Sequence, residues 1–120
     1  MLKIYKINNT MISELIDENL VITEVQDALD ILGDSGANGC NRIILKEKNL
    51  HADFFRLHTR LAGEILQKFS TYDFKLAIVG DFSKYNSKNL QDFIRESNKG
   101  NRIFFVQSLD EAIKKLSGIR

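Results

Sequence analysis

The segment from Gly80 to Asn89 brings together the side chains best suited to chemistry. The carboxylate of Asp81, the hydroxyl of Ser83 and the ammonium of Lys84 follow one another closely, and Ser87 precedes an amphipathic run. A hydroxyl in that position caps a helix by accepting from its first free N–H groups. The segment is therefore a candidate site for a small anion or for a partner.

A second interpretation of this segment is a solvated loop. Phe82 and Tyr85 are interspersed with its polar residues and could fold back to cover the core, which would leave Ser87 as a helix cap and nothing more. The sequence leaves both interpretations open.

Another group of candidate residues lies between positions 47 and 60. Asp53 is placed to cap a helix beginning soon after it, because its carboxylate would accept from N–H groups two or three residues further on. Phe54 and Phe55 are adjacent and cannot point the same way. One is expected in the core, and the other either packs under the loop or is presented to a partner. Thr59 lies in the expected first turns of this helix.

Two arginines extend this group. Arg56 and Arg60 are four residues apart, so on a helix they would share one face and could grip a phosphate or a carboxylate. A solvated helix face explains the same spacing.

Several common catalytic and cofactor motifs are missing. The sequence contains no phosphate-loop, dinucleotide-binding, zinc-helix or nucleophile-elbow pattern. His51, His58 and Asp53 lack the spacing typical of a transition-metal site. Cys40 has only Arg42 as a nearby basic residue and is expected to be a small buried thiol, not a nucleophile. We therefore predict no metal, no cofactor and no catalytic residue.

Hydrophobic periodicity predicts the elements that must position these residues. Two strand-like runs joined by Asn8-Asn9-Thr10 predict an amino-terminal hairpin over Leu2–Ile7 and Met11–Ile16. Apolar runs predict three further strands at 43–45, 76–79 and 103–106. The glycine-rich stretch 33–39 is expected to be a loop.

Four helices are expected between and after these strands. The first begins at a capping box formed by Thr23 and Gln26 and stops at Gly33. The second carries an apolar stripe over 57–69, and the third is marked by the apolar residues of 90–94. Ser108 and Glu111 form a second capping box ahead of the last helix.

This alternation predicts an α/β fold of the order ββαβαβαβα over a single domain, 1–120. Strands that are apolar at successive positions are typical of parallel sheets, whose faces are covered by crossover helices. We expect one mixed sheet with an antiparallel strand at the amino-terminal edge. The loops after the third and fourth strands, 46–56 and 81–89, would then meet at the carboxyl edge, where open α/β sheets bind ligands.

Composition fits a soluble globular protein. The 120 residues are 43% hydrophobic and 28% charged, enough to build a real core. The 17 Lys and Arg against 16 Asp and Glu give a net charge of +1, without the broad positive field of a nucleic-acid binder. One cysteine cannot form an internal disulfide, and no run approaches membrane-spanning length. We expect a cytoplasmic protein that binds neither nucleic acid nor membrane.

Blocks covering nearly the whole chain resemble an uncharacterised bacterial family, the domain of unknown function 4180. The blocks are Gln26–Asp30, Asp53–Phe55, Leu61–Ser70, Leu76–Tyr85 and Phe93–Asn98. The chain departs from the family pattern at Arg56, His58 and Arg60, where an acid, a lysine and a glycine are usual.

The layout of this family is similar to the STAS domain of bacterial anti-sigma-factor antagonists. A STAS domain has an amino-terminal strand pair, then βα units, and after its third strand an Asp-Ser-Ser/Thr-Gly motif whose hydroxyl is phosphorylated to switch partner binding. Asp53 stands where that Asp would be, but Phe54 and Phe55 replace the hydroxyls. The resemblance therefore does not extend to the usual phosphoswitch. Thr59 is the nearest substitute hydroxyl, close to two arginines that could accommodate a phosphate.

These observations favour a non-enzymatic, STAS-like regulatory module that binds a protein partner or a small ligand through the loops after the third and fourth strands. Its candidate binding residues are Asp53, Phe54, Phe55, Thr59, Asp81, Ser83, Lys84 and Ser87.

Two alternatives remain. The first is a small anion-binding protein or enzyme that uses the Asp81–Lys84 loop. The second is a homodimer that buries a sheet face which four modest helices leave uncovered. The apolar side chains that would need such cover are those of Ile43, Ile44, Leu45, Phe104 and Phe105.

Overall fold

The polypeptide begins with a β-hairpin. In the computed structural model, which describes residues 1–118, β1 (Leu2–Ile7) pairs antiparallel with β2 (Thr10–Leu15). Asn8 and Asn9 connect the strands with φ angles of 52° and 67°. Two-residue hairpin turns need positive φ values of this kind, and asparagine tolerates them better than most residues. The predicted hairpin is confirmed.

Three parallel strands extend the sheet from β2. β3 (Arg42–Lys46), β4 (Lys75–Val79) and β5 (Ile103–Val106) each run parallel to the preceding strand, which gives the order β1-β2-β3-β4-β5. The predicted single mixed sheet with an antiparallel amino-terminal edge is therefore confirmed, as is the element order ββαβαβαβα.

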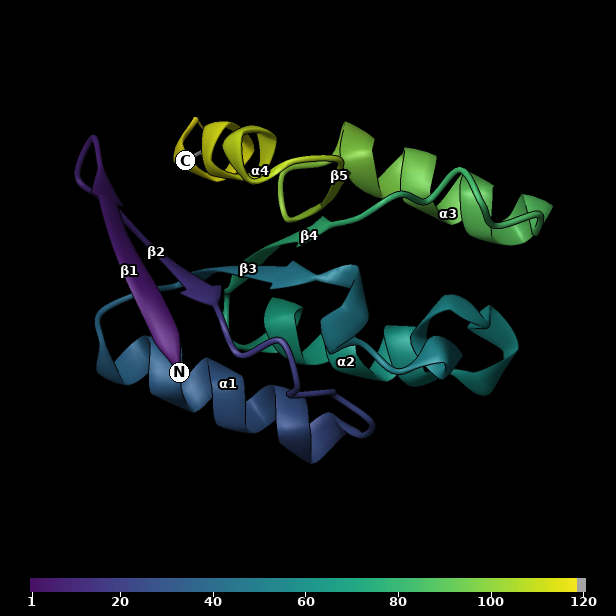
Figure 1. Ribbon diagram of the computed structural model, residues 1–120, viewed down its shortest axis with the longest axis horizontal. Coiled ribbons are helices and arrows are strands. Elements are labelled where there is room, and N and C mark those ends of the chain that lie inside the picture. The colour runs from purple at the N-terminus through teal and green to yellow at the C-terminus, as the bar shows by residue number, and fades with distance from the viewer. Residues whose placement is uncertain (119–120) are drawn as a thin grey trace.

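The helices form two layers around the sheet. α1 (Val25–Ala37), α2 (Leu61–Thr71) and α3 (Lys88–Lys99) connect successive parallel strands. Right-handed crossovers that progress in one direction put their helices on the same face, and all three helices contribute to one core cluster. α4 (Leu109–Ser117) packs on the opposite face against β2, β4 and β5. Figure 1 shows α1 and α2 below the sheet and α4 above it. No helix within residues 1–118 has both the length and the hydropathy needed to cross a membrane.

Both faces of the sheet are covered within the chain. Ile43, Leu45 and Phe105 lie in the cluster with α1, α2 and α3, whereas Ile44 and Phe104 lie in the cluster with α4. None of these five side chains is more than 6% exposed. The prediction that four helices leave an apolar face of the sheet uncovered, on which the homodimer alternative rests, is wrong.

The first helix differs from its prediction at both ends. Its N-cap is Glu24, and the carboxylate of Asp27, not the Gln26 side chain, accepts from the backbone N–H of Glu24 at 3.2 Å and of Thr23 at 2.9 Å. The predicted capping box is thus wrong by one position.

The carboxyl-terminal part of α1 includes most of the predicted glycine-rich loop. The helix runs through Gly33 and Gly36 to Ala37, and the positive φ of 76° falls only at Gly39. Ser35, fully buried in the last turn, forms a 2.7 Å hydrogen bond with the hydroxyl of Ser13 on β2. Packing of this kind outweighs the low helix propensity of glycine.

The second helix begins later than predicted. Three short 3-10 helices precede it, η1 (Glu47–Asn49), η2 (Ala52–Phe55) and η3 (Leu57–Thr59), and α2 itself starts at Leu61. Asp53 therefore does not cap α2. Arg56 and Arg60 do not share a helical face either, because Arg60 is the N-cap residue and has left-handed backbone angles (φ 69°, ψ 0°).

A side chain occupies the outer edge of β5. Asn98, near the end of α3, accepts from the Phe105 N–H at 2.8 Å and donates to the Phe105 carbonyl at 3.2 Å. The carbonyls of Arg102 and Val106 face β4, since they accept from Leu76 and Gly80. Phe105 therefore points its backbone groups outward, where the asparagine amide takes the place of a neighbouring strand.

Candidate functional site

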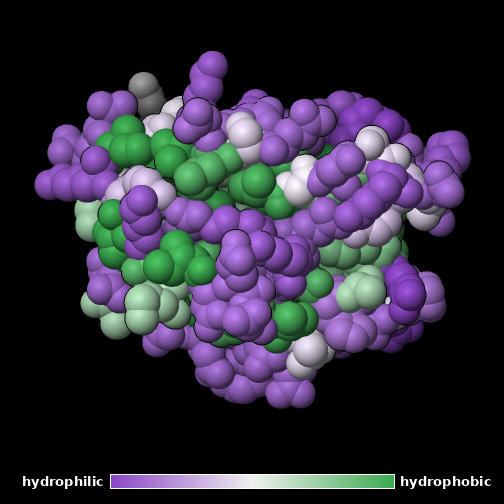
Figure 2. All heavy atoms as spheres, in the orientation of Figure 1, coloured by the Kyte–Doolittle hydropathy of each residue, from purple (hydrophilic) through white to green (hydrophobic). Residues whose placement is uncertain are grey.

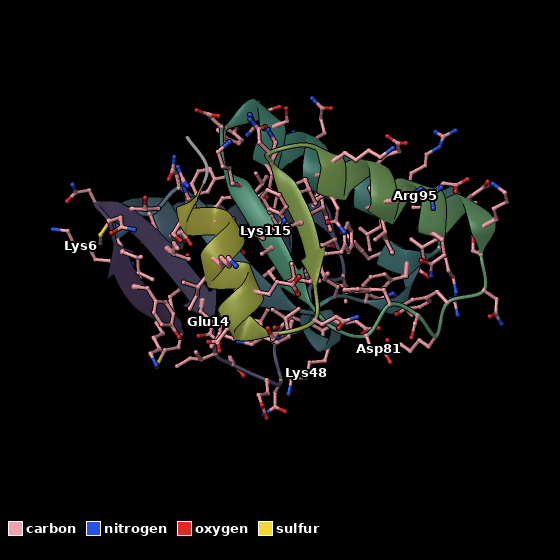
Figure 3. The ribbon with its side chains drawn as sticks, turned by 90° about the horizontal axis from the view of Figure 1, so that it is seen from above. Lys6, Glu14, Lys48, Asp81, Arg95 and Lys115 are labelled. Carbon is pink, nitrogen blue, oxygen red and sulfur yellow. The ribbon has the colours of Figure 1, made fainter. Side chains whose placement is uncertain are left out.

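The loops that follow β3 and β4 meet at the carboxyl edge of the sheet, as predicted. Glu47, the first residue after β3, has a carboxylate that accepts from the Tyr85 hydroxyl and lies 2.8 Å from the Lys84 ammonium. Lys48 and Asp81, which follow β3 and β4, lie along the lower edge of the view in Figure 3. In Figure 2, in which this edge faces the reader, hydrophilic side chains form a band across the middle of the surface.

Glycine at position 80 allows this approach of the two loops. A Cβ atom on Gly80 would lie 2.7 Å from both Cβ and Oε1 of Glu47 and 3.1 Å from the ring of Phe82. The first two distances are too short for any side chain to be accommodated without movement. The first residue after β4 therefore limits where the Glu47 carboxylate can lie.

Aromatic rings pack beneath the contact between Glu47 and the β4 loop. Phe55 stacks on Tyr85 with ring centroids 5.0 Å apart and an interplanar angle of 15°, and Phe54 meets Phe55 edge-on at 5.1 Å. Both phenylalanines are buried, so neither is presented to a partner as an exposed anchor. Phe82 is buried and Tyr85 packs against the core, which confirms that these two rings fold back over it.

A hollow of about 290 Å³ lies beside the Glu47 contact, and we call it the rim hollow. Phe55, Leu50 and Tyr85 form its apolar part, and Glu47, Lys48 and Lys84 supply its charges. Of the eight predicted binding residues, Phe55 and Lys84 line it.

The other polar residues of the β4 loop have local partners. The backbone N–H and the hydroxyl of Ser83 donate to Asp81 Oδ1 at 3.1 Å and 2.6 Å. These hydrogen bonds, first that from the side chain and then that from the backbone, lower the pKa of Asp81. Ser87 accepts from the Leu90 N–H at 3.2 Å and caps α3, as predicted.

Asp53 and Thr59 organise the 3-10 helices. The Asp53 carboxylate pairs with Arg56 at 3.2 Å, and its backbone N–H donates to Nδ1 of His51 at 3.0 Å. The Thr59 hydroxyl lies 2.6 Å from the Asp53 carbonyl and 2.8 Å from the Arg56 carbonyl. A phosphate on Thr59 would break these contacts, so the structure gives this hydroxyl a role in the turn.

A second charged cluster at the same edge was not predicted. Glu14 on β2 is buried, accepts from the Tyr5 hydroxyl at 2.6 Å, and pairs with Lys46 at the end of β3. Lys46 Nζ also donates to the Leu15 carbonyl at 3.0 Å. Burial raises the pKa of Glu14, but the hydrogen bonds from Lys46 and Tyr5 outweigh it and the net shift is downward. The only signal in the sequence is a glutamate among apolar residues near the end of the second strand.

The residues considered for metal binding and nucleophilic chemistry are not assembled into a site. Residues 1–118 contain no cluster of three or more histidine, cysteine, aspartate or glutamate side chains arranged to hold a metal ion. Cys40 is 2% exposed, and burial raises the pKa of its thiol. The predicted small buried thiol is confirmed.

A larger hollow, of about 710 Å³, lies on the face of the sheet that α1, α2 and α3 cover. We call it the α2 groove. It crosses the first two turns of α2, from Val25 on α1 to Phe93 on α3, and Leu57 and Arg60 stand at its end. It includes none of the eight predicted binding residues. Its lining comes from three helices and a turn, and no local sequence pattern signals such a combination.

Comparison with known proteins identifies a family for this chain. No curated protein and no solved structure matches the chain. The family model described as Domain of unknown function (DUF4180) matches residues 7–116. This match spans the sheet from the end of β1 to β5 together with both loops of the carboxyl edge. The chain belongs to the DUF4180 family.

Proposed function

We propose that this protein is a non-enzymatic, STAS-like regulatory module of the cytoplasm that recognises a protein partner through the carboxyl edge of its sheet. The interaction surface consists of the rim hollow and the loops after β3 and β4 around it. The element order ββαβαβαβα supports the STAS-like part of the proposal. A cytoplasmic location suits a chain with a single cysteine.

The observation that carries the proposal is the position of Glu47. Its side chain is only 16% exposed, while Lys84, with which it pairs, is 57% exposed. The Glu47 carboxylate thus joins the two loops, while the Lys84 ammonium remains largely exposed to solvent. A preorganised surface of this kind lowers the entropic cost of binding a partner.

The ionisation of the nearby groups favours recognition over catalysis. Burial and the hydrogen bond to Glu47 raise the pKa of Tyr85, so its phenol keeps its proton at neutral pH. Hydrogen bonds from Ser83 lower the pKa of Asp81, which stays ionised. Neither group is poised to exchange a proton near neutrality, whereas both can serve as fixed hydrogen-bonding groups.

Site-specific photo-crosslinking in the native host tests this proposal. A photoreactive phenylalanine derivative is placed at Ala52 or at Lys48, both of which line the rim hollow, and at Tyr72 as a control. Tyr72 is 57% exposed and follows α2 at the opposite edge of the sheet. We expect one discrete adduct from the two rim positions and none from Tyr72.

The charge-reversal variant Lys84→Glu provides a second arm of the same experiment. It should weaken the adduct formed from Ala52, because it removes the exposed cation and leaves Glu47 beside a like charge. Identical adducts from Ala52 and Tyr72, or no adduct from either rim position, would contradict the proposal.

A further inference from the structure

The α2 groove has an apolar floor that none of the residues 1–118 fills. α2 turns Leu61, Ile65 and Phe69 into the core, and the short residues Ala62 and Gly63 line the groove. A Cβ atom on Gly63 would meet no other atom within 4 Å. The space above this position is therefore open and wide enough for a side chain or for part of a ligand.

The walls of the groove are also apolar. Val25 and Phe93 stand on either side of α2, and Leu57 lies at its amino-terminal end. All three side chains are half-buried. The volume of about 710 Å³ falls in the range that accommodates a small organic molecule. A ligand that fits this groove has an apolar body.

The charged residues that line the groove favour an anionic head group. They are Arg60, Glu64 and Lys68, with a net charge of +1. The structure of residues 1–118 gives the side chains of Arg60 and Lys68 no hydrogen bond and no ion pair, although most other arginines and several lysines have one. Two cations without carboxylate partners beside apolar surface are complementary to an amphiphilic anion.

The backbone at the entrance adds to this preference. Arg60 occupies the N-cap position of α2, but its guanidinium cannot accept a hydrogen bond and does not cap the helix. The Leu61 N–H donates instead to the Thr59 hydroxyl at 3.3 Å. Arg60 also keeps a left-handed conformation, with φ of 69°, that glycine would adopt more easily. The chain thus keeps a cation at a position where the backbone favours glycine.

We propose that the α2 groove binds a small amphiphilic anion, in which an apolar body lies over Ala62 and Gly63 and one anionic head group contacts Arg60. Lys68 lies further along the groove and contributes a weaker, longer-range attraction. This site is separate from the rim hollow, so the inference stands or falls independently of the crosslinking result.

NMR titration of the full chain with octanoate and with octyl phosphate tests this proposal. We expect saturable shifts of backbone amides in the first two turns of α2 and at Phe93 for at least one of the two anions. The comparison of the two distinguishes a carboxylate from a phosphate head group. Octylammonium has the same apolar body and the opposite charge, and it should bind at least about tenfold more weakly.

Two substitutions in the groove should remove the binding and keep the fold. Gly63→Leu fills the open space, and leucine also has a higher helix propensity than glycine. Arg60→Gly removes the cation and suits the left-handed backbone. Each should weaken binding of the anion about tenfold or more without lowering the midpoint of thermal unfolding. The matched control is Gly33→Leu, at another helical glycine with no atom within 4 Å of its Cβ position, and its affinity should equal that of the parent protein.

Three results would overturn the proposal. The first is the absence of saturable binding for both anions. The second is binding of octylammonium as tight as that of octanoate. The third is unchanged affinity in folded Gly63→Leu and Arg60→Gly variants.

Discussion

At the scale of single residues, one carboxylate fixes the relative position of two loops. Glu47 begins η1, yet its two partners, Lys84 and Tyr85, lie more than thirty-five residues later in the sequence. The contact depends on the bare Cα of Gly80, which leaves room for the glutamate. Position 80 therefore controls the geometry of the carboxyl edge without contributing a side chain.

The variant Gly80→Ala tests this dependence. The added methyl group cannot fit at 2.7 Å from Glu47, so Glu47 must move away from Lys84 and Tyr85. We expect the free energy of unfolding, measured by urea denaturation, to fall by about 1–3 kcal/mol.

Gly100→Ala serves as the control for this variant. Its Cβ atom would lie 3.5 Å from the nearest atom, an ordinary contact with the Ser97 carbonyl, and its stability should stay within about 0.5 kcal/mol of the parent protein. Equal stabilities of the two variants would contradict the role assigned to Gly80.

The sequence could indicate which loops carry the site but not which residues meet there. Asp81, Ser83 and Lys84 stood out because they are polar and adjacent, yet Asp81 and Ser83 contact each other within their own turn. Glu47 did not stand out, because a glutamate between two lysines is typical of a solvated surface. Its partners are determined by the register of β3 and β4, a tertiary property.

At the scale of elements, α1 shows how packing overrides local propensity. Gly33, Asp34, Ser35 and Gly36 predict a loop, but the helix continues to Ala37 because Ile31, Leu32 and Ser35 are buried against the rest of the core. The strands were predicted more accurately. Three apolar residues in succession, as at 43–45, have few alternatives to a covered parallel strand.

The start of α2 was missed for a different reason. The apolar spacing of Leu57 and Leu61 suits an α-helix, but three 3-10 helices occupy 47–59 and Arg60 takes a left-handed conformation. 3-10 helices are short and have no sequence period of their own that could be recognised.

Substitution of Gly33 tests the helical assignment of the glycine-rich stretch. Gly33→Ala adds a methyl group in open space in the interior of α1. It should raise the free energy of unfolding by about 0.5–1 kcal/mol, since alanine loses less backbone entropy in a helix. Urea denaturation measures the change.

Gly39→Ala is the informative contrast. Gly39 lies just beyond the helix with a φ of 76°, a conformation that is strained for alanine, so this substitution should lower the free energy of unfolding by about 1 kcal/mol. A gain at position 39 or a loss at position 33 would contradict the boundaries of α1.

At the scale of the whole molecule, a charged cluster joins the hairpin to the parallel strands. Tyr5, Glu14 and Lys46 come from β1, β2 and β3 and are joined by side-chain hydrogen bonds. Burial, followed by the hydrogen bond to Glu14, raises the pKa of Tyr5 from 10.0 to about 12. The free energy of unfolding should therefore depend on pH in the alkaline range, where Tyr5 titrates.

The sign of this linkage follows from the raised pKa. The folded state keeps the Tyr5 proton through the window from pH 10 to about 12, in which the unfolded state releases it. The stabilisation by Tyr5 is complete below pH 10 and is lost as pH rises through about 12.

The variant Tyr5→Phe isolates this contribution, because it removes the hydroxyl that titrates and keeps the aromatic ring. The difference in free energy of unfolding between the two proteins should be constant up to pH 10 and shrink between pH 10 and 12, as measured by urea denaturation with circular dichroism. A difference that stays constant across this window would show that Tyr5 does not carry the linkage.

The asparagine at the outer edge of β5 bears on how copies of this chain can assemble. A sheet with two open edges can add copies at both ends and grow into a filament. Here the Asn98 amide already occupies the Phe105 backbone groups, so a strand that added at β5 would have to displace both of these hydrogen bonds. A single amide side chain thus disfavours growth of the sheet beyond β5.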